Sequence, residues 1–158
     1  MVYFYPLLNL QVTLTDATMK DTELRQEKDR EIYSIYVRGI REHDFASLEA
    51  AADWVRSQPA SKFYISPKAL LNSITAIERG TKAKKRFRAN DTKLRILYGM
   101  YLNYLAENPT NKISKERICE ILSEMPAPRF FICQESCLDA INRERSRIRK
   151  EIEIQNQR

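Results

Sequence analysis

The chain has 158 residues, of which 43% are hydrophobic and 30% charged, with only three glycines and six prolines. This length suits one ordinary domain or two very small ones, and so little glycine and proline argues against a loop-rich, disordered or all-β chain. The formal net charge is +6, and it is concentrated: residues 79–95 hold eight Lys or Arg and a single acidic residue, Asp91. A concentration of this kind favours an anionic partner.

Several classes of protein are disfavoured by the same composition. Three cysteines without close CxxC spacing predict a reducing compartment. No apolar run is long enough to span a membrane, and the N-terminus lacks the basic region and cleavage site of a secretory signal. Cys119, Cys133 and Cys137 with His43 do not make a convincing tetrahedral site, and there is no glycine-rich phosphate loop. We therefore expect a cytoplasmic protein with no cofactor, metal, membrane partner or enzymatic activity.

Residues 1–27 are expected to form an N-terminal extension or arm. The stretch "VYFYPLLNLQVTL" is compatible with a strand-like arm that docks on a partner, or with a flexible extension. It has no counterpart later in the chain.

Residues 28–90 are predicted to form a first unit of three helices. Apolar residues at 32, 33, 36, 37 and 40 follow the spacing of one helical face. A second helix should begin at the capping residue Ser47 and end before Pro59. A third should begin at Ser66 and Pro67 and end near Gly80.

Residues 91–158 repeat this pattern. "REIYSIYVRGI" (30–40) matches "RILYGMYLNYL" (95–105) at a separation of 65 residues, and the helix after Ser47 matches the one after Ser114 at 67. The third helix should start near Gln134 and, meeting no glycine, continue past Lys150. The predicted fold is therefore mainly α, with two tandem three-helix units related by internal duplication.

The repeat includes an unusual octapeptide, "PASKFYIS" (59–66) and "PAPRFFIC" (126–133). Its central residues, KFYI and RFFI, suit a short extended segment between the second and third helices of each unit. Two interpretations stay open. The copies pair with each other as an antiparallel two-stranded sheet about a pseudo-twofold axis, or each closes the core of its own unit.

The basic residues favour a non-enzymatic, nucleic-acid-binding protein, with DNA the preferred partner, because lysine and arginine neutralise phosphates and release counterions. We expect the phosphates to contact basic side chains of the octapeptides, the segment between the units and the last helix: Lys62, Lys82, Lys84, Lys85, Arg86, Arg88, Arg129, Arg143, Arg145, Arg147 and Arg149. The simpler interpretation of these runs is a solvated linker and ordinary surface ion pairs.

The alternative class is a structural or adaptor protein in a larger assembly. It would contact a protein partner, or another copy of itself, through the N-terminal arm and the C-terminal helix. Leu138, Ile141, Ile148 and Ile152 fall on one face of that helix and could pack on the body or on another chain.

Overall fold

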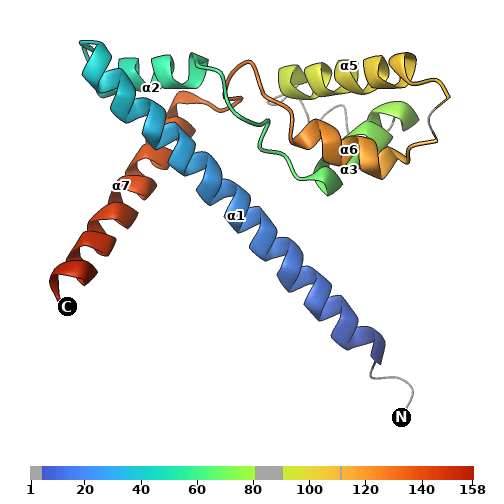
Figure 1. Ribbon diagram of the computed structural model, residues 1–158, viewed down its shortest axis with the longest axis horizontal. Helices are drawn as coiled ribbons and strands as arrows, with labels where there is room; N and C mark the ends of the chain where they lie inside the picture. The colour runs from blue at the N-terminus through green and yellow to red at the C-terminus, as the bar shows by residue number, and fades with distance from the viewer. Residues whose placement is uncertain (1–4, 81–90, 111) are drawn as a thin grey trace.

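The computed structural model describes residues 5–80, 91–110 and 112–158, with side chains from residue 21 onward except that of Asp91. These residues form six helices: α1 (Tyr5–Glu42), α2 (Leu48–Ser57), α3 (Pro67–Arg79), α5 (Asp91–Glu107), α6 (Lys115–Ser123) and α7 (Gln134–Asn156) (Figure 1). No strand occurs in the described ranges. The prediction of a mainly helical chain is confirmed.

The helix ends lie where the capping residues predicted them. The hydroxyl oxygen of Ser47 accepts the amide N–H of Ala50 at 3.1 Å, and Ser66 and Ser114 make the same contact three residues ahead at 3.2 Å. Proline is the first residue of α3, and Gly80 ends this helix in the left-handed conformation that glycine adopts without steric cost. α7 continues past Lys150 to Asn156, as expected.

The expectation of a strand-like arm is wrong from Tyr5 onward. α1 begins at Tyr5 and passes residues 27 and 28, where the arm was expected to meet the first unit, without a break. The β-branched residues that suggested a strand are outweighed by helix-favouring neighbours, and Pro6 lies in the first turn, where its missing N–H does no harm. Figure 1 shows the N-terminal part of α1 extending away from the other helices.

The helices pack in two groups, and neither group is a continuous part of the chain. α7 packs on α1 and α2, and we call these three helices the first lobe. α6 packs on α3 and α5, and we call these the second lobe (Figure 1). The third helix of each expected unit, α3 or α7, therefore packs on the second helix of the other unit, α6 or α2.

A continuous set of buried side chains joins the lobes. Ile32, Val55 and Ile141 are fully buried in the first lobe, and Leu97 and Leu122 in the second. Phe63 and Phe130, one from each octapeptide, are buried between them. None of the described helices has the length and apolarity needed to cross a membrane.

The octapeptides meet in a single antiparallel bridge, without a two-stranded sheet. The amide N–H of Ala60 donates to the carbonyl of Ala127 at 3.0 Å, and that of Ala127 donates to the carbonyl of Ala60 at 3.0 Å. Pairing does not continue, because Pro59 precedes Ala60, prolines lie on both sides of Ala127, and Tyr64 has a φ of 54°, outside the extended region.

Candidate functional site

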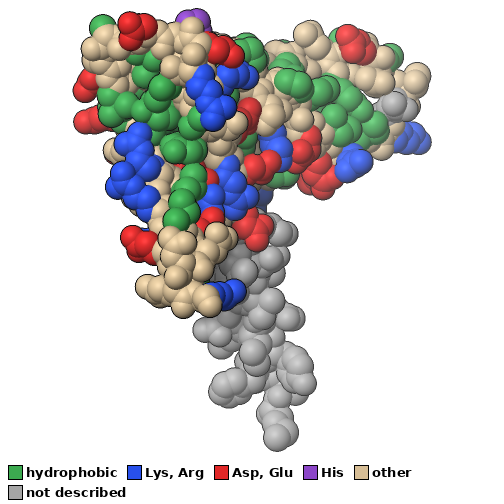
Figure 2. Space-filling model, turned by 60° about the vertical axis from the view of Figure 1, so that its left-hand side comes forward, with side chains coloured by type: hydrophobic (Ala, Val, Ile, Leu, Met, Phe, Trp, Pro, Cys, Tyr) green, Lys and Arg blue, Asp and Glu red, His purple; other side chains and the backbone are tan. Residues whose placement is uncertain are grey.

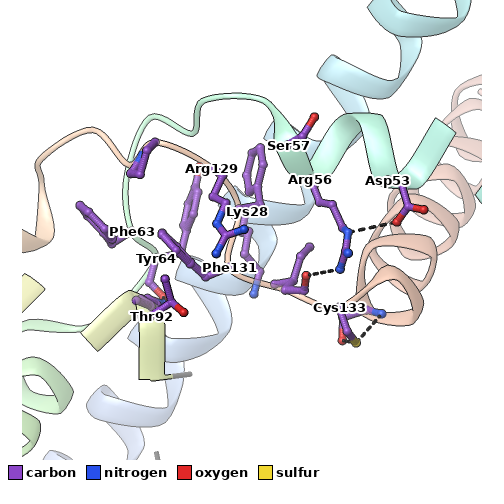
Figure 3. Close-up of a pocket in the computed structure, with 15 residues that line it drawn as sticks. Lys28, Asp53, Arg56, Ser57, Phe63, Tyr64, Thr92, Arg129, Phe131 and Cys133 are labelled. Carbon is purple, nitrogen blue, oxygen red and sulfur yellow. Dashed lines mark hydrogen bonds and ion pairs between the residues drawn. The ribbon is translucent and has the colours of Figure 1, made fainter. Parts of the chain in front are cut away.

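A cleft of about 850 Å³ lies beside this bridge. It is bounded by α1, the end of α2, the first turn of α5, both octapeptides and the start of α7 (Figure 3). The residues lining it are Lys28, Asp53, Arg56, Ser57, Phe63, Tyr64, Thr92, Lys93, Pro128, Arg129, Phe130, Phe131, Ile132, Cys133 and Ser136. Its volume is within the usual range of sites for small molecules.

Two stacked pairs of aromatic rings line the cleft. Phe63 stacks on Phe131 with ring centroids 5.9 Å apart and an interplanar angle of 8°. Tyr64 stacks on Phe130 at 6.3 Å and 11°. Phe63 and Phe130 are buried, whereas Tyr64 and Phe131 are half-buried, so the latter two present ring surface to the cleft.

Tyr64 is held in a backbone conformation that bulky residues rarely adopt. Its hydroxyl donates to the carboxylate of Glu31, which also accepts the amide and hydroxyl of Ser61, both at 2.7 Å. Burial and the bond to Glu31 raise the pKa of Tyr64, so the hydroxyl keeps its proton at neutral pH. These contacts offset the strain of the left-handed backbone, which costs on the order of 1–3 kcal/mol.

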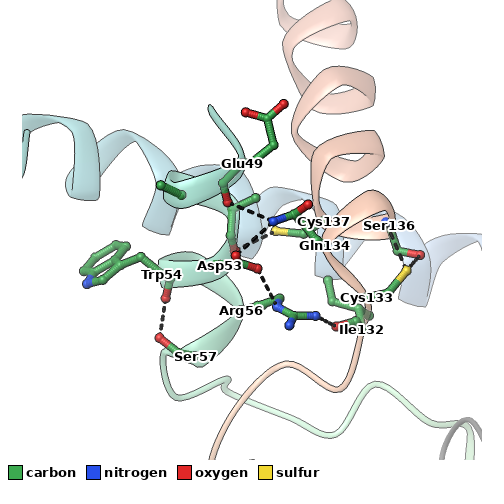
Figure 4. Close-up of polar contacts among 12 residues, drawn as sticks. Glu49, Asp53, Trp54, Arg56, Ser57, Ile132, Cys133, Gln134, Ser136 and Cys137 are labelled. Atoms are coloured by element: carbon green, nitrogen blue, oxygen red, sulfur yellow. Dashed lines mark hydrogen bonds and ion pairs between the residues drawn. The ribbon is translucent and has the colours of Figure 1, made fainter. Parts of the chain in front are cut away.

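Two arginines lie on the walls of the cleft. The guanidinium of Arg129 lies over the ring of Phe131, 5.0 Å from its centroid, in a cation–π contact. Arg56 is bound by Asp53 at 3.1 Å and donates to the carbonyl of Ile132 at 3.0 Å (Figure 4). Arg56 therefore fixes the second octapeptide, whereas Arg129 remains exposed.

Two lysines complete the positive lining. Lys28 comes from α1 and Lys93 from the first turn of α5, and the Nζ of Lys93 lies 3.5 Å from the carbonyl of Tyr64. Burial, with repulsion from Lys28, lowers the pKa of Lys93 to about 8. Burial also lowers the pKa of Lys28, although Asp29 acts in the opposite direction. Within the described part of the chain, neither ammonium group forms an ion pair with a carboxylate.

The cleft as a whole is therefore cationic. Its lining contains four basic side chains, and Asp53 is the one carboxylate that the described residues place there. Asp53 is already occupied, since it binds Arg56 and accepts a hydrogen bond from Gln134 at 2.9 Å (Figure 4). An anion with a flat, apolar part would meet complementary charge and ring surfaces here.

Cys133 is an exposed thiol at the rim of the cleft, where it caps α7. Hydrogen bonds from the side chain and amide of Ser136 lower the pKa of this thiol. Cys137, one turn later, is buried and donates to the carbonyl of Ala52 (Figure 4). No cluster of three potential metal ligands occurs among the described residues.

The two basic residues that precede the aromatic pairs, Arg129 and Lys62, have different surroundings in the structure. Arg129 lies in the cleft, as described above. Lys62, which precedes the first aromatic pair, is bound by Glu27 at 2.9 Å and by Glu124 at 3.5 Å, and the hydrogen bond that it donates to Glu27 raises its pKa. Lys62 is therefore engaged within the protein. The candidates Lys82, Lys84, Lys85, Arg86 and Arg88 lie outside the described residues.

The candidate arginines of α7 are largely engaged as well. Arg143 makes a bidentate pair with the buried Asp29 at 2.8 and 3.0 Å, and Arg145 donates to the hydroxyl of Tyr36 at 3.1 Å. Arg147 binds Glu144 at 2.9 Å and also Glu151, whereas Arg149 is exposed. On the face of the molecule in Figure 2, basic side chains alternate with acidic and apolar ones and form no continuous patch.

The sequence interpretation did not include Lys28 or Lys93 among the site residues. A signal was present, because these two lysines have the same separation, 65 residues, as the similar sequences 30–40 and 95–105. Both lysines line the same cleft.

Comparisons of the chain with protein-family models, with curated proteins and with solved structures found no match.

Proposed function

We propose that the protein binds nucleic acid without catalysing a reaction, and that the cationic, aromatic cleft is its principal contact surface. The observation that carries this proposal is the convergence of Lys28, Lys93 and Arg129 with the half-buried rings of Tyr64 and Phe131. Nucleic acids offer both complements, a negative phosphate and a flat base.

In the proposal, the basic residues between α3 and α5 add positive charge that is adjacent to the cleft residues in the sequence. They follow α3 and lead directly into the first turn of α5, where Thr92 and Lys93 line the cleft. A nucleic acid that binds to Lys93 would thus meet further basic residues of the protein that are adjacent to Lys93 in the sequence. Arg143 and Arg147 are removed from the proposed contact residues, because they are engaged by carboxylates.

We also propose that the cleft arose from an internal duplication in which the third helices are exchanged. Residues matched by the repeat would pair across a pseudo-twofold axis at the bridge between Ala60 and Ala127. The two stacked pairs support this axis, because exchanging the two octapeptides turns Phe63–Phe131 into Phe130–Tyr64. The packing of α7 on α2 and of α3 on α6 has the same symmetry.

A salt titration of binding tests the proposed function. We expect the affinity for a labelled oligonucleotide, measured by fluorescence anisotropy, to fall steeply as salt rises, with a linear dependence on the logarithm of salt concentration. Arg129→Gln should lower the affinity and make its dependence on salt concentration less steep. Arg38→Gln, which removes one exposed positive charge from α1 outside the cleft, is the matched control. The absence of binding at low salt would refute the proposal.

The adaptor function remains a second candidate because of the end of α7. Leu138 and Ile148 are partly buried and Ile141 is fully buried, but Ile152 is 51% exposed. Ile154 is 55% exposed. Light scattering after size-exclusion chromatography distinguishes the two functions, since an α7 that pairs with another copy should give a dimer that Ile152→Glu dissociates.

A further inference from the structure

We propose that the cleft accepts an unpaired nucleotide, so that the protein selects single strands over duplexes: one base stacks against Phe131 and the guanidinium of Arg129 that lies over it, and the phosphate lies between Lys28 and Lys93. This inference rests on the proposed function and specifies its substrate class. It follows from the shape of the cleft, the orientation of its rings and the position of its uncompensated charges.

The shape of the cleft favours a single nucleotide over a double helix. It is a concave site of about 850 Å³ enclosed by parts of four helices and two connecting segments. A duplex presents phosphates on a convex surface and keeps its bases stacked inside, so it could touch the rim but could not place a base against the rings. A single strand can turn a base outward without breaking base pairs.

The rings provide a surface for such a base. Phe131 is half-buried, is supported by Phe63 and has the guanidinium of Arg129 over its ring, 5.0 Å from the centroid (Figure 3). Guanidinium groups and aromatic rings both stack on nucleobases, and this contact tolerates any base because every base has a π-face. We expect little sequence preference.

The lysines provide the site for a phosphate. Lys28 from α1 and Lys93 from the first turn of α5 both line the cleft, and burial disfavours the charged form of each. A phosphate between them would compensate both charges at once. No contact within the described part of the chain does this.

The test compares two ligands and two variants of one residue. Binding of a fluorescent ten-nucleotide oligothymidylate and of a blunt duplex of the same length is measured by fluorescence anisotropy at one salt concentration. We expect the wild type to prefer the single strand. Phe131→Leu should weaken single-strand binding about 5- to 100-fold and leave duplex binding unchanged. Phe131→Tyr, which places at 131 the residue found at the matching position 64, should retain the affinity.

A second measurement does not depend on the folding of a variant. Ultraviolet crosslinking of a single strand carrying 5-iododeoxyuridine to the wild-type protein, followed by peptide mass spectrometry, should label residues 126–133. Crosslinks to residues outside 126–133 would overturn the inference. So would equal affinity for the single strand and the duplex, if Phe131→Leu changes neither affinity. Either result would leave the proposed function standing. The absence of binding to both ligands would overturn the two together.

Discussion

The backbone of Gly39 in α1 lies against the indole of Trp54 in α2, so closely that a Cβ atom at position 39 would be 2.5 Å from Cζ3 of the ring. We expect Gly39→Ala to force the indole aside and to destabilise the protein by about 1–3 kcal/mol. Thermal unfolding followed by circular dichroism measures this cost.

Gly99→Ala is the matched control for this substitution. Gly99 also lies within a helix, α5, but nothing is within 4 Å of the position that its Cβ atom would take. The higher helix propensity of alanine should therefore stabilise the protein by about 0.5–1 kcal/mol. The two substitutions should have opposite signs, and equal effects would contradict the packing of α1 on α2.

The buried phenylalanines of the two octapeptides should be important for stability. Phe63→Ala and Phe130→Ala each remove a ring that is buried between the lobes, and each should cost roughly 3–5 kcal/mol of unfolding free energy. Ile154→Ala, at an exposed position of α7, should change stability by less than about 0.5 kcal/mol. Denaturant titration compares the three variants. If all three resemble the wild type, the octapeptides do not join the lobes.

The pair between Arg143 and Asp29 should be structural. Arg143→Gln leaves the buried carboxylate of Asp29 without its bidentate partner, which should cost about 1–3 kcal/mol. Arg149→Gln removes the same charge from an exposed position of the same helix and should have little effect on stability. A melting temperature that responds equally to both variants would show that Arg143 and Asp29 are not paired in solution.

Lys93 should reduce the stability of the protein at neutral pH. Its pKa is about 8 in the folded state and near 10.5 when unfolded, so the unfolded chain binds more protons between these values and stability rises with pH across them. Lys93→Met should therefore stabilise the protein at pH 7, on the order of 2 kcal/mol, with a benefit that shrinks between pH 8 and 10. The difference between variant and wild type isolates Lys93 from other titrating groups. A benefit that is constant with pH would contradict the assignment.

The exchange of third helices predicts how fragments behave. Residues 1–90 contain α1 and α2 without α7, and residues 91–158 contain α6 without α3. Each fragment alone should be poorly folded, and mixing them should restore the helical circular dichroism and cooperative melting of the whole chain. If each fragment melts cooperatively by itself and mixing changes nothing, each half of the chain folds on its own helices and the third helices are not exchanged.

The helix boundaries that capping residues mark could be predicted from the sequence because they depend on local contacts, whereas the start of α1 could not. A serine that caps an amide three residues ahead, as at Ser47 and Ser114, is visible without knowledge of the fold. The left-handed Gly80 is equally local. The bond between Arg147 and Glu144 has helical spacing and could also have been anticipated.

The packing partners and most of the site could not be predicted in this way. An amphipathic pattern identifies the buried face of α7 but not the helices that cover it, and Asp29, the partner of Arg143, is 114 residues away. The same limit applies to Lys28, which became a site residue only when the fold placed it in the same cleft as Lys93. The left-handed backbone of Tyr64 has no sequence signal, because tyrosine rarely adopts it.

The packing of α7 on α1 and α2 also has a consequence for biosynthesis. α1 and α2 leave the ribosome well before α7, so the apolar face that includes Ile32 and Val55 is uncovered while the residues between Ser57 and Gln134 are still being translated. Contacts between such distant segments form late. The nascent first lobe is therefore the part of the chain that we expect a chaperone to shield.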